Sequence, residues 1–428
     1  MRYALINPRW SFEGSIYFGC REPHLPLELG YSKALLEQNG HEPILIDAAL
    51  NNLPDSEIVS RVRHFKPDFI VITTAPTYLF WRCPPPEIRV PQELACALKN
   101  LGGRLVAVGP HGSTTPRAVL KKMPVDVVVL GECEEILPQL PAGLAQVPSI
   151  AYRDGEEVIV RGPNRASDMK RLPTLRWSDD LTARHKHHHH RFDLEPAGPG
   201  AEMEASRGCP YHCTFCAKDN FRNNYRKRPL PAVLEEVDSF LAQGVEYIYF
   251  IDEIFLPDRQ LLDGLAERKV KIGVQTRIDL WNEESIRALA RAGCVSIEAG
   301  VESISEAGRA YLDKKCKLTT DELGVRLLFA KKLVPFVQAN LLAMTEDDEQ
   351  AVEDWRRQLE SNGVWANKPV PLFPYPGSPE YTRMWGPVDD IAWERAHDEY
   401  LKRFDSFSDI QEQRPRPLVE LESVCHER

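Results

Sequence analysis

The sequence of 428 residues predicts an α/β protein in which a Rossmann-like open parallel sheet precedes a partial (β/α)6 barrel. Two stretches in which short β-rich runs alternate with helical patterns support this prediction, because such alternation is typical of parallel sheets covered by helices. The first stretch occupies residues 1–147 and the second 201–385, with a hairpin and linker at 148–200 between them. Residues 386–428 are predicted to form a helical extension and tail.

The first stretch contains five candidate strands rich in β-branched and apolar residues, separated by helix-like segments such as LGYSKALLEQNG. An open parallel sheet holds its ligands at the carboxyl ends of its strands, so the loops after these runs are candidate ligand loops. A β-hairpin is then predicted in IAYRDGEEVIV (150–160), around the turn Asp154-Gly155. The candidate strands are RYALIN (2–7), PILID (43–47), DFIVIT (68–73), RLVAVG (104–109) and DVVVL (126–130).

The second stretch contains six candidate strands, two fewer than a complete eight-stranded barrel has. Helix starts between them are marked by capping residues: Asn282 is placed to cap NEESIRALARAG, and Thr345 with Asp348 forms a capping-box pattern. The candidate strands are AEMEASR (201–207), EYIYFID (246–252), KIGVQTRID (271–279), VSIEAGVE (295–302), FVQANLLAM (336–344) and ANKPVPLF (366–373).

Composition excludes several classes of protein. The formal charge of −10 argues against nucleic acid or an anionic membrane as the main partner. No apolar run is long enough to span a bilayer, and the start MRYALINPRW lacks the pattern of a signal peptide. Ten cysteines without a secretion signal fit a reducing compartment, where clustered thiols indicate metal binding or catalysis. A cytoplasmic protein is predicted.

The segment SRGCPYHCTFCAKD (206–219) places Cys209, Cys213 and Cys216 at C-x3-C-x2-C spacing. Three thiols are one fewer than a structural zinc site or a closed iron–sulfur cluster normally uses. His212 could complete a zinc site, although the sequence has no second C-x2-C pair for a zinc ribbon. The triplet follows the first strand of the predicted barrel, where barrel enzymes place their chemistry. A cluster on three cysteines would leave one iron open for a ligand.

This triplet, with Phe215 before its last cysteine, resembles the radical S-adenosylmethionine (SAM) superfamily. Segments downstream are similar in the same order, so the resemblance covers residues 200–385. It implies a radical SAM barrel that carries a [4Fe–4S] cluster, whose open iron binds the amino and carboxylate groups of SAM and cleaves it to a 5′-deoxyadenosyl radical. The similar segments are GVEYIYFIDEIF (244–255), VQTRIDLWNEESIRALARAGCVSIEAGVES (274–303), TEDDEQAVEDW (345–355) and PLFPYPGSPEY (371–381).

The resemblance also implies roles for individual residues at the ends of the barrel strands. The cluster ligands would be Cys209, Cys213 and Cys216. Phe215 would pack near the adenine of SAM. Every other implied SAM residue also has the plain alternative of being an ordinary polar residue of the barrel rim. The implied SAM-binding residues are Phe215, Asp252 and Glu253, Gln275 and Arg277, and Gly300 and Glu302.

The first domain resembles the cobalamin-binding domain that precedes many radical SAM barrels. The similar segments are 25–48 and 106–135, and a domain of this fold that has lost its ligand is the alternative. The D-x-H-x-x-G motif that places a histidine under cobalt in mutase-type domains is absent, and His111 is not an axial ligand in this class. The implied cobalamin-binding residues are Thr73 and Thr74, Gly109, Pro110, His111 and Gly112, and Gly131 and Glu132.

The two resemblances together imply a cobalamin-dependent radical SAM enzyme, with C-methylation of an unactivated carbon as the favoured reaction. The expected cofactors are a [4Fe–4S] cluster, SAM and cobalamin. The expected partners are a small-molecule or biosynthetic substrate and an electron donor such as flavodoxin or ferredoxin. Non-methylating radical chemistry, such as cyclisation, ring contraction or rearrangement, and a sensor without turnover remain alternatives.

Three further features receive plainer interpretations. The histidine-rich stretch RHKHHHHRF (184–192) could bind a transition metal, but its place in an unpatterned segment favours a solvated linker. The basic segment FRNNYRKRP (221–229) is interpreted as a barrel rim rather than an anion site. Methylthiotransferases carry a second cluster on three N-terminal cysteines, but the segments around Cys20, Cys83 and Cys133 do not match that family.

Overall fold

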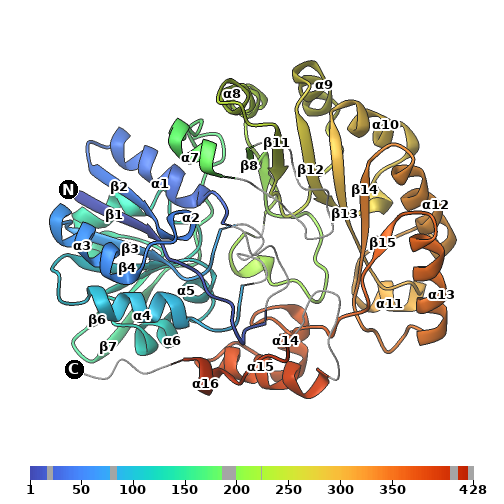
Figure 1. Cartoon of the computed structure of the whole chain (residues 1–428). Helices are drawn as coiled ribbons and strands as arrows, with labels where there is room; N and C mark the ends of the chain where they lie inside the picture. The colour runs from blue at the N-terminus through green and yellow to red at the C-terminus, as the bar shows by residue number, and fades with distance from the viewer. Residues whose placement is uncertain (17–22, 78–83, 186–198, 223, 405–412, 423–428) are drawn as a thin grey trace.

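A computed structural model of the chain describes residues 1–16, 23–77, 84–185, 199–222, 224–404 and 413–422. Two α/β units lie side by side, and the C-terminal helices run beneath both of them in the view of Figure 1. The predicted α/β fold class is therefore confirmed. The histidine-rich stretch from residue 186 onward, Cys20, Cys83 and Cys425 lie outside the described residues.

The first unit is a seven-stranded sheet with the order β2-β1-β3-β4-β5-β6-β7. Its first five strands are parallel. The predicted hairpin is present as β6 and β7, which continue the same sheet: β6 pairs antiparallel with β5, and β7 pairs antiparallel with β6. The strands are β1 (Arg2–Asn7), β2 (Glu42–Asp47), β3 (Phe69–Thr73), β4 (Arg104–Val108), β5 (Val127–Val129), β6 (Ile150–Asp154) and β7 (Glu157–Arg161). The helices are α1 (Leu27–Gln38), α2 (Ala48–Asn51), α3 (Asp55–Phe65), α4 (Arg89–Leu98), α5 (Pro110–Thr114) and α6 (Pro116–Lys122), with short 3-10 turns η2 (Leu137–Ala142) and η3 (Leu144–Gln146).

The strand order identifies the ligand edge of this sheet. In doubly wound sheets of order 2-1-3-4-5, ligands bind outside the carboxyl ends of the strands, at the point between β1 and β3 where the winding reverses. Thr73 ends β3, and Gly109 and Gly131 follow β4 and β5 at the same edge. The loops predicted to bind a ligand therefore share one edge of the sheet.

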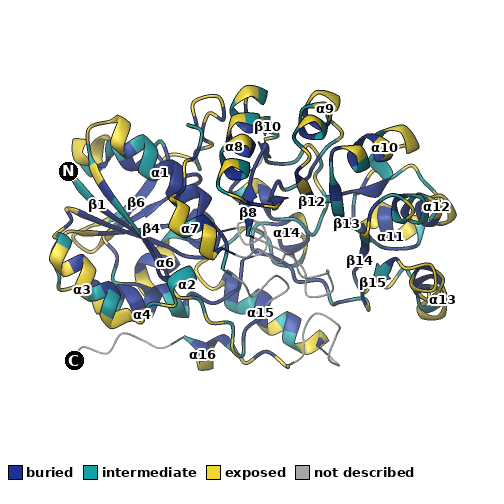
Figure 2. Ribbon diagram, turned by 45° about the horizontal axis from the view of Figure 1, so that its top comes forward, coloured by how far each residue is buried: buried dark blue, intermediate teal, exposed yellow. Residues whose placement is uncertain are grey.

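Both faces of this sheet are covered. Successive side chains of a strand point to opposite faces, and here each face has its own hydrophobic core. Tyr3 and Leu5 of β1 pack into one core, while Ala4 and Ile6 pack into the other. Figure 2 shows the strands as buried and the outer sides of the surrounding helices as exposed. This double burial explains why the β-rich runs could be recognised as nearly continuous apolar segments.

A buried carboxylate near this sheet predicts a pH-dependent stability. Glu87 is 6% exposed, and the hydroxyl of Ser15 donates a hydrogen bond of 2.7 Å to it. Burial raises the pKa of Glu87 to about 7, and Glu422 raises it further while the Ser15 hydrogen bond and Arg89 oppose the rise. An unfolded glutamate has a pKa of about 4.3. The folded chain therefore holds this proton more tightly than the unfolded chain does. The contribution of Glu87 to the free energy of unfolding is fully present below about pH 4.3 and is lost as the pH rises through about 7.

We expect the Glu87→Gln variant to lose less stability than the wild type between pH 5 and pH 8. The amide keeps an acceptor for Ser15 but carries no titrating proton, so the difference should be on the order of 2 kcal/mol. Denaturant unfolding at several pH values measures it. Glu57→Gln, at an exposed pair with Arg61, is the matched control. Parallel pH profiles for the wild type and Glu87→Gln would contradict the assignment.

The second unit is a six-stranded parallel sheet with the order β15-β14-β13-β12-β11-β8, and helices follow its strands in turn (Figure 1). This arrangement confirms the predicted partial barrel. The strands are β8 (Gly200–Met203), β11 (Tyr247–Phe250), β12 (Lys271–Thr276), β13 (Cys294–Glu302), β14 (Phe336–Leu341) and β15 (Trp365–Ala366), and β9 (Ser206–Arg207) pairs with β10 (Arg226–Lys227) separately. The helices are α7 (Asp179–Arg184), α8 (Leu230–Ala242), α9 (Arg259–Arg268), α10 (Glu283–Arg291), α11 (Glu306–Tyr311), α12 (Thr320–Lys331) and α13 (Glu349–Glu360), with 3-10 turns η4 (Lys218–Asn220) and η5 (Ile278–Leu280).

Two local predictions for this unit were wrong. The run 366–373 was predicted as a strand, but β15 ends at Ala366. Prolines cannot donate to a ladder, and beyond β15 the side chain of Asn367 bonds the main chain of Leu341 instead. The capping box predicted for Thr345 is also absent, because Asp348 is the N-cap and accepts from the backbone of Ala351 at 2.8 Å. The predicted cap Asn282 is confirmed.

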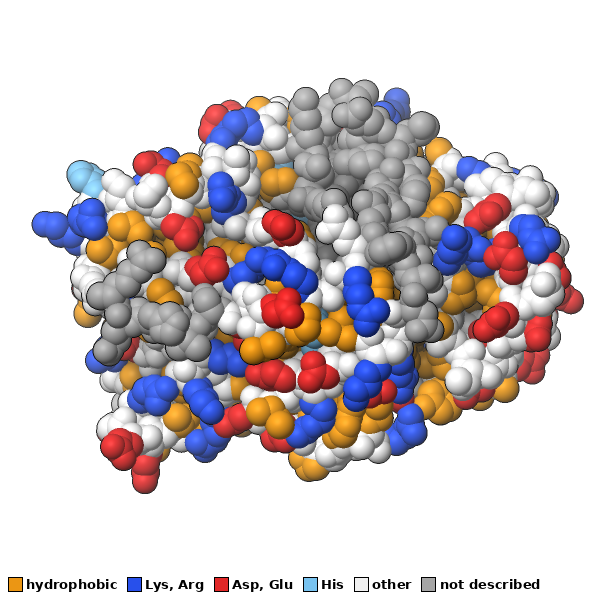
Figure 3. All heavy atoms as spheres, turned by 60° about the horizontal axis from the view of Figure 1, so that its bottom comes forward, with side chains coloured by type: hydrophobic (Ala, Val, Ile, Leu, Met, Phe, Trp, Pro, Cys, Tyr) orange, Lys and Arg blue, Asp and Glu red, His pale blue; other side chains and the backbone are white. Residues whose placement is uncertain are grey.

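The C-terminal helices α14 (Pro379–Trp385), α15 (Ala392–Arg403) and α16 (Leu418–Leu421) join the two units. The indole of Trp393 donates to Thr115 at 3.0 Å, and Lys122 pairs with Glu394 and Glu422 at 2.7 Å each. On the face shown in Figure 3, basic and acidic side chains are interspersed rather than gathered by sign. Among the helices of the described ranges, none has the length and apolar character that crossing a membrane requires.

Candidate functional site

The cysteine loop begins at a glycine whose conformation other residues cannot easily adopt. Gly208 has φ +78°, and a Cβ atom there would lie 2.2 Å from the carbonyl oxygen of Asn224. Glycine therefore lets β9 and the loop turn close to the neighbouring backbone. Thr214, between the cysteines, donates from its backbone to Leu312 at 3.0 Å and accepts from Glu380 at 2.9 Å. The loop is thus held between the barrel and α14.

The segment PYPGS packs beneath the end of this loop. The side chain of Asn220 donates to the carbonyl of Pro376 at 2.6 Å. Gly377 has φ +83°, and a Cβ atom there would approach the Asn220 amide to within 2.2 Å. Asn164 of the first unit also donates to the backbone of Asn220. This contact brings the cysteine loop against both halves of the chain.

The three thiols are half-buried among basic groups. Burial raises the pKa of Cys209 and Cys213, whereas Lys218, Lys314 and Arg277 act in the opposite direction. Positive charge near a thiol favours the thiolate, which is the form that binds metal. The basic groups therefore offset part of the effect of burial on Cys209 and Cys213, in the direction that metal binding requires.

The alternative zinc site receives no support from the described residues. His212 is exposed, and its ring lies 3.2 Å from the carboxylate of Asp219 rather than among the thiols. Among the described residues, no three cysteine, histidine or acidic side chains converge to hold a single metal ion. Ligands of a cubane cluster bind different irons and need no common centre. This ligand set therefore fits a cluster better than a zinc ion.

The predicted SAM residues Asp252 and Glu253 follow β11 and face the start of the cysteine loop. Asp252 accepts from the backbone of Ala205 at 2.9 Å and from the hydroxyl of Ser206. Burial raises the pKa of Asp252 to about 8. Glu253 accepts from the backbone of Gly208 at 2.8 Å. Both carboxylates therefore brace the strand that leads into the loop.

Arg277, predicted at the end of β12, stands beside the cysteine loop. It pairs with Asp279 at 2.7 Å, and its guanidinium lies 4.2 Å from the ring centre of Tyr211 in the loop. Its Nη1 atom is buried without a hydrogen-bond partner. An unpaired buried donor is unfavourable unless a ligand satisfies it, so this atom fits the carboxylate of a bound molecule. The side chains of Gln275 and Phe215 are both half-buried.

Lys314 is a site residue that the sequence did not reveal. Its ammonium group donates to the carbonyl of Gly300 at 2.9 Å and contacts the carboxylate of Glu302, two residues that were predicted to bind SAM. Burial lowers the pKa of Lys314 to about 8. Nothing in YLDKKCK distinguishes Lys314 from Lys315. Only the fold shows which of the two faces the site.

The predicted cobalamin residues gather at the ligand edge of the first sheet. The hydroxyls of Thr73 and Thr74 are buried without hydrogen-bond partners at the end of β3. Gly109 has φ +127°, and a Cβ atom there would lie 2.6 Å from the Thr74 hydroxyl. Pro110 and Gly112 lie in α5, which starts directly after Gly109. Unsatisfied hydroxyls beside a side-chain-free turn fit a bound polar group such as a corrin amide.

His111 is placed unlike an axial ligand. Its ring is buried, its Nε2 atom lies 2.9 Å from the carbonyl oxygen of Pro85, and its centre lies 4.6 Å from that of Trp393. Burial lowers its pKa to about 3. The ring is therefore neutral and packs between α5 and α15.

Glu132 was predicted to contact cobalamin, but its carboxylate is already used within the protein. It accepts from Arg207 at 3.0 Å, from Arg226, and from the backbone of Ser167 at 2.8 Å. Burial opposes ionisation of Glu132, and the arginines outweigh it and hold its pKa below its usual range. The preceding Gly131, with φ +85°, would place a Cβ atom 2.2 Å from the carbonyl oxygen of Arg165.

Comparison with known proteins adds two family assignments. Residues 203–359 match the radical SAM superfamily, and residues 20–141 match the B12-binding domain. The chain is 25% identical over 409 residues to the anaerobic magnesium-protoporphyrin IX monomethyl ester cyclase of Cereibacter sphaeroides, covering 87% of this chain and 63% of that protein. It is 24% identical over 379 residues to an uncharacterized methyltransferase of Pyrococcus horikoshii, covering 84% and 77%.

The fold is also similar to that of a solved structure. The radical S-adenosylmethionine methyltransferase TsrM from Kitasatospora setae, with tryptophan substrate and a SAM analogue bound, superposes with a TM-score of 0.72. The match covers 90% of this chain and 76% of that one at 17% identity. At this identity the match establishes a common fold.

Proposed function

Since this chain belongs to the radical SAM superfamily and carries a B12-binding domain, we propose that it is a cobalamin-dependent enzyme that methylates an unactivated carbon. The junction of the two domains carries the proposal. Glu132 and Glu134, which follow β5 at the predicted cobalamin edge, bind Arg207, two residues before Cys209. When bound, the cluster and SAM supply a 5′-deoxyadenosyl radical and cobalamin supplies a methyl group, so both must reach one substrate carbon.

The chain's own residues are proposed to bind and orient these groups. Cys209, Cys213 and Cys216 would hold the cluster as thiolates. The free Nη1 of Arg277 is suited to the carboxylate of SAM. Lys314 would hold the backbone at Gly300 in place. Arg277 would thus neutralise a charge of the bound molecule, and Lys314 would position the backbone beside it.

Cobalamin is proposed to bind without a histidine ligand. The electron paramagnetic resonance spectrum of the bound cob(II)alamin form should show no nitrogen superhyperfine splitting from His111, because the Nε2 atom of His111 is directed at the carbonyl of Pro85. Thr73→Val and Thr74→Val should weaken binding of cobalamin by on the order of tenfold, as loss of hydrogen bonds to a buried ligand predicts. A splitting that disappears in His111→Ala would contradict this assignment.

A second candidate is non-methylating radical chemistry. The similarity to a cyclase over 87% of this chain favours it, and this chain spans only 63% of that cyclase's length. A cyclisation uses no methyl group from SAM. The two candidates therefore differ in whether S-adenosylhomocysteine forms together with 5′-deoxyadenosine.

Anaerobic incubation of the fully loaded protein with SAM and dithionite tests the proposed class of enzyme. We expect 5′-deoxyadenosine to accumulate, and reduced flavodoxin or ferredoxin to replace dithionite as electron donor. No 5′-deoxyadenosine above background, with four irons and one cobalt bound per chain, would leave a non-catalytic sensor as the better interpretation.

A further inference from the structure

A buried network of charged side chains, which we call the interdomain ion cluster, joins the two domains. It consists of Glu132 and Glu134 from the first domain and Glu204, Arg207, Arg222, Arg226 and Glu253 from the barrel. Arg207 lies at its centre, fully buried, with Glu132 at 3.0 Å and Glu134 at 2.7 Å.

The barrel side of this cluster reaches the cysteine loop. Arg222 lies 3.5 Å from Glu204 and 3.0 Å from Glu253. Glu253 in turn accepts from the backbone of Gly208, the residue directly before Cys209. A displacement of the first-domain carboxylates would therefore be transmitted through arginines to the start of the loop that is proposed to hold the iron–sulfur cluster.

The first-domain side is equally constrained. Ser167 donates from its backbone to Glu132 at 2.8 Å and from its hydroxyl to Glu134 at 3.0 Å. The turn between β5 and these two glutamates needs the left-handed conformation of Gly131. This turn follows β5, which neighbours β4 and the loop that begins at Gly109. The two carboxylates are thus fixed relative to the predicted cobalamin edge.

A buried ion network of this kind need not add net stability, because desolvation of the charges offsets their attraction. Arg207 lies on β9, the strand that leads to the cysteine loop, and it pairs with two glutamates that follow β5 of the first domain. A contact that served stability alone would not need to connect these two segments. We propose that the interdomain ion cluster is a positioning device that sets the distance between the cobalamin site and the cysteine loop. This inference rests on the proposed function, because it assumes that both cofactors bind.

The test compares Glu132→Gln and Glu134→Gln with the wild type. Each substitution keeps the shape and one acceptor oxygen but removes a charge that faces Arg207. Glu235→Gln, which removes an exposed partner of Arg176, is the matched control. Loaded protein is incubated with methyl-deuterated SAM and dithionite. The label recovered on extracted cobalamin is divided by the 5′-deoxyadenosine formed.

We expect this ratio to fall by on the order of tenfold in Glu132→Gln and Glu134→Gln, since small displacements of reacting groups have effects of this size. The control should keep the wild-type ratio. Loss of folded protein alone lowers both products together and leaves the ratio unchanged, so an unchanged ratio would overturn the proposal. Glu134→Asp, which keeps the charge on a shorter side chain, should restore part of the ratio.

A second readout does not depend on turnover. In the loaded wild type, the paramagnetic cob(II)alamin and the reduced cluster should show a defined magnetic interaction in their resonance spectra. In Glu132→Gln and Glu134→Gln, we expect this magnetic interaction to become weaker or its strength to cover a wider range of values. An identical interaction in wild type and variants would overturn the positioning role. If the wild type transfers no label but the magnetic interaction changes as expected, the proposed methylation fails and the positioning inference stands.

Discussion

Replacing Cys216 by alanine is expected to abolish the iron–sulfur absorbance and the formation of 5′-deoxyadenosine. Cys216 is one of three thiols on a loop that the barrel and α14 hold in place, with its backbone bonded to Cys213 at 3.1 Å. Loss of one of three ligands leaves two irons of a cubane without protein ligands, and the cluster should not persist. Iron analysis and product chromatography after anaerobic reconstitution measure both effects.

Cys294→Ala is the matched control for this experiment. Cys294 is a buried thiol at the start of β13 that donates to the carbonyl oxygen of Ser296 at 3.3 Å, and it is far in sequence from the loop. Its loss should leave about four irons per chain. A loss of iron from Cys294→Ala equal to that from Cys216→Ala would show that the cluster assignment is wrong.

Arg207→Met is expected to destabilise the folded chain by about 3–5 kcal/mol, the usual effect of removing one partner from a buried ion pair. The side chains of Arg207, Glu132 and Glu134 are 0% exposed, so the remaining carboxylates would be left without their central cation. The thermal midpoint of the cofactor-free protein should fall by about 3–6 °C. Differential scanning calorimetry measures this shift.

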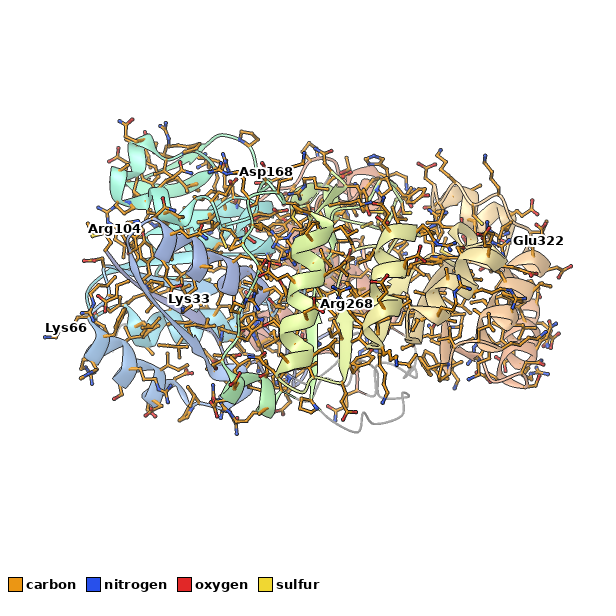
Figure 4. The ribbon with its side chains drawn as sticks, turned by 90° about the horizontal axis from the view of Figure 1, so that it is seen from above. Lys33, Lys66, Arg104, Asp168, Arg268 and Glu322 are labelled. Atoms are coloured by element: carbon orange, nitrogen blue, oxygen red, sulfur yellow. The ribbon has the colours of Figure 1, made fainter. Side chains whose placement is uncertain are left out.

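Arg268→Met provides the comparison. Arg268 lies at the periphery of the barrel, on α9, and pairs with Asp238 of α8 at 2.7 Å with side chains 21% and 53% exposed (Figure 4). Ion pairs near the surface contribute about 0–1 kcal/mol to the free energy of unfolding. The thermal midpoint of the Arg268→Met variant should therefore stay close to that of the wild type. Equal shifts for the two variants would show that burial of Arg207 has no special consequence.

The strands of both domains could be predicted because each lies in a sheet with apolar cores against it. A strand was predicted wrongly where most of the run lies outside the sheet. The run 366–373 contains two prolines, and the structure has only Trp365–Ala366 as strand there. The apolar residues of that run were mistaken for a ladder that its prolines cannot complete. Helix starts were predictable where a single capping residue stood alone, as at Asn282.

The candidate site was predictable only where residues are close in sequence. The spacing of the three cysteines is local, and the loops at strand ends follow from parallel topology. The interdomain ion cluster is not local, because Glu132 and Arg207 are 75 positions apart. Glu132 was therefore interpreted as a ligand contact, although its carboxylate accepts from Arg207, Arg226 and the backbone of Ser167. Lys314 was missed for the same reason.

The most direct test of the proposed methylation is the fate of the methyl group of SAM. The loaded protein is incubated anaerobically with methyl-deuterated SAM, dithionite and the small-molecule fraction of the source cells. If the enzyme methylates its substrate, S-adenosylhomocysteine and 5′-deoxyadenosine appear together, and mass spectrometry finds a product that carries the deuterated methyl group. Product and 5′-deoxyadenosine that form without any deuterium transfer would contradict methylation and favour the cyclase-like alternative.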